Sequence, residues 1–363
     1  MIRFGFMLMA LFALCLSSSA QPKRVVNFYN WSDYIEPSVL RDFSRETGIE
    51  VRYDTFDSND TLETKLLAGK SGYDVVAPTG YFLERQIKAG IFQKLDKAKL
   101  PNLKYAWDEI AVRLAAYDPG NQYAVNYMWG TTGIGYNVKK VAAILGADAK
   151  IESWDQIFKP EQLARFKDCG VMMLDSSDDI LAAALRYLGL DPNTKNASEI
   201  EKAAELVIKL RPSVRKFHSS EYLNALASGE ICLAVGWSGD IQQAKRRARE
   251  ASRGTEIAYV IPKEGAQMWF DNLALPKDAA HVAEAHELIN YLAQPHVAAR
   301  NSNFLGYANG IGASRPLLDP SVVNDLTIYP DAQTMQRLYT LGAHDQKTQR
   351  LMNRLWTKVK TGR

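Results

Sequence analysis

The chain has 363 residues, of which 47% are hydrophobic and 23% charged, and its formal net charge is only +3. This composition is that of a globular protein long enough for two lobes of ordinary domain size. No basic run with interleaved aromatic residues stands out, and the cluster AKRRARE reads as a solvated helix face. Together with the small net charge, this argues against a nucleic-acid partner.

The first twenty residues have the pattern of a secretory leader. Arg3 precedes the apolar run FGFMLMALFALCLSS, and the small residues SSA then supply a cleavage site. The pattern predicts a signal peptide over residues 1–20, a mature start at Gln21 and a periplasmic protein. A membrane anchor would need a longer apolar run, and a lipid anchor on Cys15 would need a small residue in place of Leu14.

Strands and helices alternate at the start of the mature chain. The predicted strands cover 25–29, 50–55 and 73–77, and the predicted helices cover 37–46, 60–68 and 81–88. This order predicts a mostly parallel sheet with helices on both faces. The loops WSDY, DSND and PTGY follow the three strands, and ligands of open α/β sheets bind at such strand ends.

The same pattern resumes later in the chain. The strands predicted there cover 171–174 and 231–235, and each is followed by a polar loop, DSSDD or GWSGD, and a helix. The segment IAYVIPKEGAQMWFDNLALP predicts two more strands, and the tail from Ser321 is predicted to be helical. The chain is therefore expected to form two α/β lobes. The first is residues 21–131 with 252–311, and the second is 132–251 with 312–363.

Three predicted strand ends place a tryptophan beside a carboxylate. The segments are Trp31-Ser32-Asp33-Tyr34, Trp237-Ser238-Gly239-Asp240 and Trp269-Phe270-Asp271. An aromatic face attracts a cation and covers methylenes, and a carboxylate gives an ammonium group a charge-assisted hydrogen bond. The pairs Trp107-Asp108 and Trp154-Asp155 have the same adjacency at predicted helix starts, so the composition alone leaves binding and ordinary packing open.

Asp175 and Asp178 stand three residues apart in LDSSDDI, directly before a predicted helix. The residues alone favour helix capping and a favourable charge at the helix N-terminus over a paired acidic wall. Catalytic patterns are weak: GWSGD departs from a nucleophile elbow at Asp240, and no Cys/His spacing indicates zinc. The sequence therefore predicts no enzyme, cofactor or metal site.

Removal of the leader leaves Cys169 and Cys232 in the chain. An even pair in an oxidising compartment suggests one disulfide, and two buried free thiols are the alternative.

Taken together, these segments resemble the periplasmic polyamine-binding proteins of ABC transporters, the putrescine and spermidine receptors. The resemblance covers nearly the whole mature chain and rests on VVNFYNWSDYI, YDVVAPTGYFLERQIKAGIFQKLDK, YMWGTTGIGYN, ICLAVGWSGD and WFDNLALP with FLGYANG. It implies a type II periplasmic binding protein fold, in which hinge strands join two lobes that close on a ligand. It also implies a disulfide between Cys169 and Cys232.

The resemblance implies a site made by both lobes. The first lobe would contribute Trp31, Ser32, Asp33, Tyr34, Thr79, Tyr81 and Phe82. The second lobe would contribute Asp175, Asp178, Trp237 and Asp240, and the set would be completed by Trp269, Asp271 and Tyr307. The resemblance implies that Asp178, Asp240 and Asp271 take ammonium groups and that Asp175 takes a third.

Within the family, Tyr81, Asp175 and Trp269 match the spermidine-preferring branch, whereas Ser32 and Asp33 match the putrescine branch. The sequence therefore favours a monomeric receptor for spermidine, with putrescine as a second ligand, that serves a membrane permease. Three alternatives stay open: a receptor of this fold for another small molecule such as thiamine, an amino acid or an iron complex; an exported enzyme acting on amines; and a polyamine sensor that docks on a signalling partner.

Overall fold

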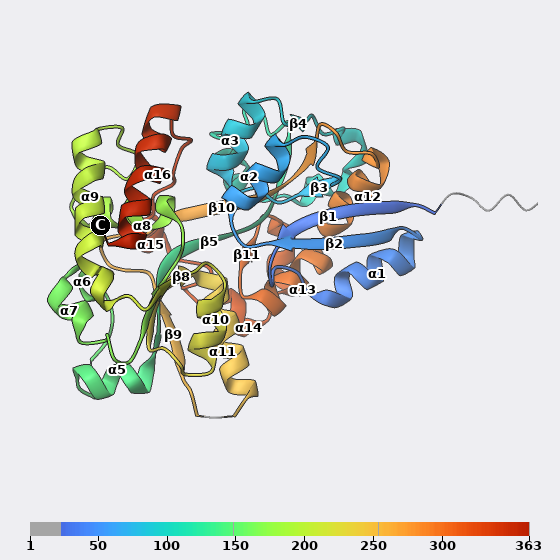
Figure 1. Cartoon of the computed structure of the whole chain (residues 1–363). Coiled ribbons are helices and arrows are strands. Elements are labelled where there is room, and N and C mark those ends of the chain that lie inside the picture. The colour runs from blue at the N-terminus through green and yellow to red at the C-terminus, as the bar shows by residue number, and fades with distance from the viewer. Residues whose placement is uncertain (1–22, 148, 253, 363) are drawn as a thin grey trace, which may run out of the picture.

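The computed structural model describes residues 23–147, 149–252 and 254–362, and the predicted signal peptide lies outside these ranges. They form two α/β lobes (Figure 1). One strand, β5 (Ala124–Asn137), belongs to both lobes. Its first part, 124–131, pairs with β10 (Met268–Pro276), and its second part, 132–137, pairs with β8 (Leu233–Trp237) and β9 (Ile257–Val260). The predicted two-lobed α/β fold is thus confirmed.

The sheet of the first lobe has the strand order β2-β1-β3-β10-β5. Parallel pairing joins β1 to β2 and β3, as the alternation predicted, whereas β10 runs antiparallel to β3 and β5. The remaining strands of this lobe are β1 (Val25–Trp31), β2 (Glu50–Phe56), β3 (Val75–Val76), β4 (Phe92–Gln93) and β11 (Ala308–Asn309). The helices are α1 (Pro37–Thr47), α2 (Asn59–Leu67), α3 (Gly80–Lys88), α4 (Asp108–Leu114), α12 (Val282–Leu292) and α13 (Pro295–Leu305), with short 3-10 turns η1 (Lys97–Lys99), η2 (Pro101–Tyr105) and η4 (Gly312–Leu317).

The second lobe has the strand order β5-β8-β6-β7, with β9 on β5. Its other strands are β6 (Val171–Met173) and β7 (Lys216–Phe217). The helices are α5 (Val138–Leu145), α6 (Asp155–Phe158), α7 (Pro160–Ala164), α8 (Ser177–Tyr187), α9 (Ala197–Leu210), α10 (Glu221–Ala227), α11 (Ser238–Glu250) and α16 (Gln346–Thr361), with the turn η3 (Arg211–Ser213). The short helices α14 (Pro320–Val323) and α15 (Ala332–Met335) lie in the connection that leads to α16.

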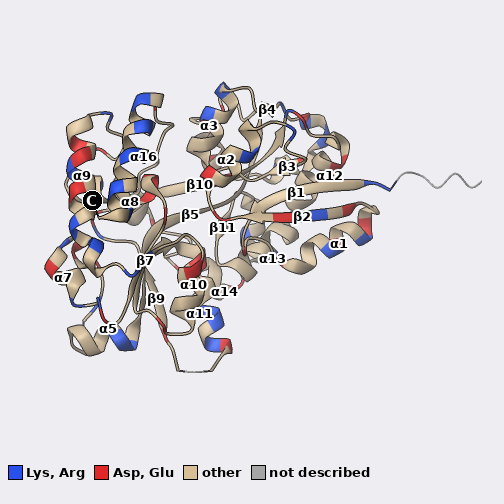
Figure 2. Cartoon of the chain, in the orientation of Figure 1, with Lys and Arg blue, Asp and Glu red and all other residues tan. Residues whose placement is uncertain are grey.

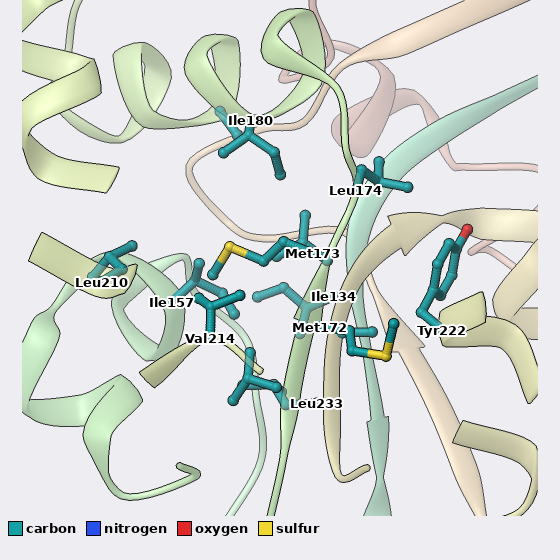
Figure 3. Packing of buried hydrophobic residues seen from close by; sticks show 14 of the residues in the cluster. Ile134, Ile157, Met172, Met173, Leu174, Ile180, Leu210, Val214, Tyr222 and Leu233 are labelled. Atoms are coloured by element: carbon teal, nitrogen blue, oxygen red, sulfur yellow. The ribbon is translucent and has the colours of Figure 1, made fainter. Parts of the chain in front are cut away.

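A core of buried hydrophobic side chains stabilises the second lobe. All three residues of β6 are buried, because helices cover both faces of this parallel part of the sheet. Met172 and Met173 lie near Ile134 of β5 and Leu233 of β8 (Figure 3). The disulfide between Cys169 and Cys232, predicted from the cysteine count and implied by the resemblance, is confirmed, with the two Cα atoms 5.6 Å apart. It ties together the starts of β6 and β8.

Local sequence signals explain where the helices begin and end. Pro37 occupies the first turn of α1, and Gly48 ends that helix in the left-handed conformation, at φ 72°. Ser176 accepts a hydrogen bond from the backbone N–H of Asp179 and so caps α8. No helix within the described ranges is both long and apolar enough to cross a bilayer.

The boundaries between the lobes differ from the prediction in two places. The segment 252–311 was assigned to the first lobe, but its strand β9 pairs with β5 in the second sheet. The segment 312–363 was assigned to the second lobe, but η4 packs against α13 of the first lobe, while α16 packs against α9 of the second. The sequence pattern predicted a strand where β9 lies and helices after Ser321, but it carries no information about which distant element each of them contacts.

Candidate ligand-binding site

A cavity of about 590 Å³, partly open to solvent, lies between the two lobes. We call it the main cavity. Most of the predicted site residues line it, and they come from both lobes. They are Trp31, Ser32, Asp33, Tyr34, Thr79, Tyr81, Trp237, Asp240, Trp269, Asp271 and Tyr307. The three that do not line it are Phe82, Asp175 and Asp178.

Asp271 is the buried acidic group that the first lobe contributes to the wall of the main cavity. A β-bulge between β5 and β10 falls directly after Asp271, and such bulges re-aim side chains next to functional sites. Tyr34 donates a hydrogen bond to one carboxylate oxygen at 2.8 Å, and Thr79 donates to the other at 2.6 Å. Burial raises the pKa of Asp271 to about 7, although both hydroxyl groups oppose this rise.

Asp240 is the buried acid of the second lobe that corresponds to Asp271 in the first lobe. The turn from β8 into α11 places it in the first turn of that helix, where a negative charge is favourable. The hydroxyls of Tyr222 and Tyr307 each donate to its carboxylate at 2.7 Å. Burial raises the pKa of Asp240 to about 6. Tyr307 belongs to the first lobe, so this hydrogen bond crosses between the lobes.

Gly239 makes that crossing contact possible. A Cβ atom at this position would lie 2.3 Å from the ring of Tyr307, which is closer than any carbon–carbon contact allows. The ring therefore packs directly on the backbone of α11. The glycine in the segment GWSGD has a structural reason, which is to admit the tyrosine that holds Asp240.

A third buried acid, Asp179, also lines the main cavity. Thr132 and Ser176 each donate a hydrogen bond to it at 2.6 Å, and the indole N–H of Trp237 donates at 3.3 Å. Burial raises its pKa above the ordinary range. The sequence interpretation assigned the neighbouring Asp178 to the site and did not assign Asp179.

Aromatic rings form the walls between these acids. The rings of Trp31 and Trp237 meet edge to face at 5.6 Å between centroids, one from each lobe. The ring of Tyr307 lies 5.4 Å from Trp269 and 5.1 Å from Tyr34 in similar edge-to-face contacts. The negative faces of such rings favour a cation, and their area covers methylene groups.

Two polar side-chain atoms of residues that line the main cavity have no hydrogen-bond partner within the described residues. Within the described residues, the indole N–H of Trp269 and the side-chain carbonyl of Gln267 are buried without a hydrogen bond. Both residues line the main cavity. Buried polar groups are nearly always paired, so two such atoms on residues that line one cavity favour a bound molecule or ordered water there.

Ser32 and Asp33 form the rim of the main cavity. The carboxylate of Asp33 accepts a hydrogen bond from Arg247 of α11 at 2.8 Å, and its backbone carbonyl accepts one from Gln243 at 3.1 Å. The hydroxyl of Ser32 donates to the carbonyl of Phe56. The Asp33 side chain is half exposed and is paired with Arg247 of the opposite lobe. This ion pair therefore joins the two lobes at the rim of the main cavity.

The predicted residues that miss the main cavity lie in a smaller space beside it. We call this the distal chamber; it is lined by Asp60, Phe82, Asp175 and Asp178, and its walls shared with the main cavity include Trp31, Tyr81, Asp179 and Trp237. The carboxylate of Asp175 is paired with Lys360, and that of Asp178 lies beside His344. The resemblance implied that Asp175 takes a third ammonium group; in the structure Asp175 lines the distal chamber and its carboxylate is already paired with Lys360.

Sequence reasoning therefore missed Asn59, Asp179 and Gln267 in the lining of the main cavity. It also missed Tyr222, which does not line the cavity but donates a hydrogen bond to Asp240. Asn59 supports Thr79 through a hydrogen bond of 2.9 Å, and Tyr222 supports Asp240. The loop DSND, already noted at a strand end, contained Asn59. Tyr222 and Gln267 carried no signal, because neither lies in a strand-end loop with a neighbouring acid.

Comparison with known proteins agrees with this geometry. The family model described as bacterial extracellular solute-binding protein matches residues 38–325. The chain is similar to the putrescine-binding periplasmic protein SpuD of Pseudomonas aeruginosa, with 50% identity over 100% of both chains. It is 37% identical to the spermidine/putrescine-binding periplasmic protein of Escherichia coli, over 91% of this chain and 90% of that one.

A solved structure leads to the same family. The fold resembles that of the spermidine/putrescine ABC transporter substrate-binding protein PotD from Streptococcus pneumoniae, with a TM-score of 0.75 and 29% identity over 93% of this chain and 99% of that one. That match and the sequence relatives span both lobes and the cavity between them. The chain belongs to the bacterial extracellular solute-binding proteins, in the group of periplasmic polyamine-binding proteins of ABC transporters.

Proposed function

We propose that this protein binds a linear diamine, putrescine or a close analogue, in the main cavity and delivers it to the permease of an ABC transporter. One observation carries the proposal: Asp240 and Asp271 are buried in an aromatic cavity and have no Lys, Arg or His partner within the described residues. Buried carboxylates need a countercharge. A diamine supplies two ammonium groups and an apolar linker to lie between the rings.

The ligand preference that we propose differs from the one the sequence favoured. Spermidine was expected because Tyr81, Asp175 and Trp269 match the spermidine branch. Tyr81 and Trp269 do line the main cavity, but Asp175 is outside it and is paired with Lys360. The relative with 50% identity is named for putrescine alone, whereas the relative named for both polyamines is 37% identical. Both findings support putrescine as the preferred ligand.

The proposal assigns no catalytic step to the chain. The relatives named above are solute-binding proteins, and both oxygens of Asp271 are held by hydroxyl donors from Tyr34 and Thr79. Such a fixed carboxylate is arranged to bind a cation. We further propose that the protein acts as a monomer in the periplasm after removal of residues 1–20, and that nucleic acid is not a partner.

Isothermal titration calorimetry with putrescine and spermidine tests the function. We expect one putrescine per chain with a dissociation constant in the micromolar range or tighter, and weaker binding of spermidine. Asp271→Asn should reduce putrescine affinity by at least about 100-fold, because an interaction between a buried charge and its partner is lost. The absence of binding heat and of thermal stabilisation with both polyamines would refute the proposal.

A further inference from the structure

One acid of the distal chamber, Asp175, differs from the buried acids of the main cavity in having a cation of the protein beside it. The ammonium group of Lys360 lies 3.0 Å from one carboxylate oxygen of Asp175 and 3.2 Å from the other. The indole N–H of Trp356 donates to the same carboxylate at 2.7 Å. Asp175 is thus turned towards α16, which carries both partners.

A second acid of the chamber, Asp178, lies beside an imidazole, but the carboxylate oxygen that faces it has no hydrogen-bond partner within the described residues. The Nε2 atom of His344 lies 3.5 Å from a carboxylate oxygen of Asp178, and both side chains are almost completely buried. In contrast, no ion pair reaches Asp179, Asp240 or Asp271 in the described ranges. The protein therefore places a lysine beside Asp175, whereas it holds the three buried acids of the main cavity only by neutral hydrogen-bond donors.

The partners of the distal acids come from one stretch of chain, the approach to α16 and α16 itself. This helix carries five Lys and Arg residues and no acid (Figure 2). It packs on α8 and α9, so Lys360 and Asp175 both belong to the second lobe. Their pairing does not depend on any contact with the first lobe.

We propose that Lys360 is a specificity-determining residue that selects diamines over triamines, an inference that rests on the proposed function. The distal chamber shares Trp31 and Tyr81 with the main cavity, so a longer polyamine held at Asp240 and Asp271 would extend its third ammonium group into it. There the ligand meets an acid whose charge Lys360 already balances. Lys360 does not line the chamber itself, but it pairs with the acid that would otherwise receive the third ammonium group.

The solvent exposure of Lys360 and Asp175 determines how strongly the lysine can weaken spermidine binding. The side chains of Lys360 and Asp175 are 41% and 38% exposed, and ion pairs of this kind contribute little to stability because water screens them. A ligand can therefore displace the lysine at a modest cost. We expect Lys360 to weaken spermidine binding, relative to putrescine binding, by roughly 3- to 10-fold.

The test measures the dissociation constants of putrescine and spermidine for three variants. Their ratio in each variant is compared with the ratio in the unmodified protein. Lys360→Met keeps the aliphatic stem and removes the charge. Lys358→Met removes the same charge from an exposed position of the same helix and is the matched control. The double variant Lys360→Met/Asp175→Asn removes the acid that the third ammonium group would gain.

We expect Lys360→Met to shift the ratio roughly 3- to 10-fold towards spermidine, Lys358→Met to leave the ratio unchanged, and the double variant to cancel the gain. An unchanged ratio in Lys360→Met would overturn the inference. So would an equal shift in Lys358→Met, which would indicate a general charge effect, or a gain that survives loss of Asp175. Titration of the unmodified protein distinguishes failure of this inference from failure of the proposed function. If the proposed function is wrong, the unmodified protein binds neither polyamine.

Discussion

The affinity for a diamine should fall steeply as the solution becomes acidic. Burial raises the pKa of Asp271 to about 7 and that of Asp240 to about 6 in the ligand-free protein. Both groups must be charged to pair with ammonium groups, which remain protonated far above neutral pH. Protons therefore compete with the ligand at both carboxylates.

The two pKa values determine the size of the effect. At pH 5.5 the proton competition at Asp271 weakens binding by about 30-fold and that at Asp240 by about 4-fold. The product is a loss on the order of 100-fold relative to pH 8, where both groups are charged. Protonation of Asp179, whose pKa is also raised, would add to this loss.

The assay is calorimetric titration of putrescine at a series of pH values between 5.5 and 8. Asp240→Asn is the informative variant, because only the contribution of Asp271 should remain, about 30-fold over the same range. The free energy of unfolding of the ligand-free protein should instead increase as the pH falls. Raised carboxylate pKa values stabilise the fold below pH 4, and this contribution is lost as the pH rises to about 7. A wild-type affinity that does not change between pH 8 and 5.5 would refute this account of the buried acids.

Three further predictions concern the residues that hold the site. Gly239→Ala should weaken putrescine binding at least about 10-fold, because the new methyl group displaces the Tyr307 ring, and a titration of the folded variant measures this. Arg247→Met should raise the dissociation rate of putrescine by about 2- to 10-fold in stopped-flow fluorescence, since it breaks the rim contact with Asp33; an unchanged rate would show that this contact does not retain the ligand. Asp179→Asn should weaken putrescine binding while Asp178→Asn has the smaller effect, and the reverse order in titrations would contradict the placement of these two residues.

The strand-end loops were predictable because their signal is local. Trp31 and Trp237 are the last residues of β1 and β8, as predicted, and an acid follows each within a few residues. Trp269 and Asp271, predicted in a strand-end loop, lie instead within the first half of β10. The resemblance to a known family then supplied Thr79 and Tyr307, which line the same cavity.

The exact direction of each acid was not predictable from these signals. Successive residues of a helix point about 100° apart, so a shift of one position decides whether Asp178 or Asp179 faces the main cavity. That choice depends on where α8 begins, and Asp179 is fixed by Thr132 of the distant strand β5. The partner of Asp175 is Lys360, 185 residues away in the chain, and no pattern near LDSSDDI indicates it.

The distribution of the acids over the two lobes connects binding with closure. Asp271 comes from the first lobe, and Asp179 and Asp240 come from the second, so bringing the lobes together gathers three carboxylates in one buried space. Without a ligand this arrangement is costly, because each charge loses water and faces the others. A dication with an apolar centre supplies ammonium partners for two of these three acids, whereas a monocation leaves two acids without a partner. The closed arrangement should therefore be populated mainly when a diamine is bound, since a ligand shifts such an equilibrium only by its difference in affinity for the two states.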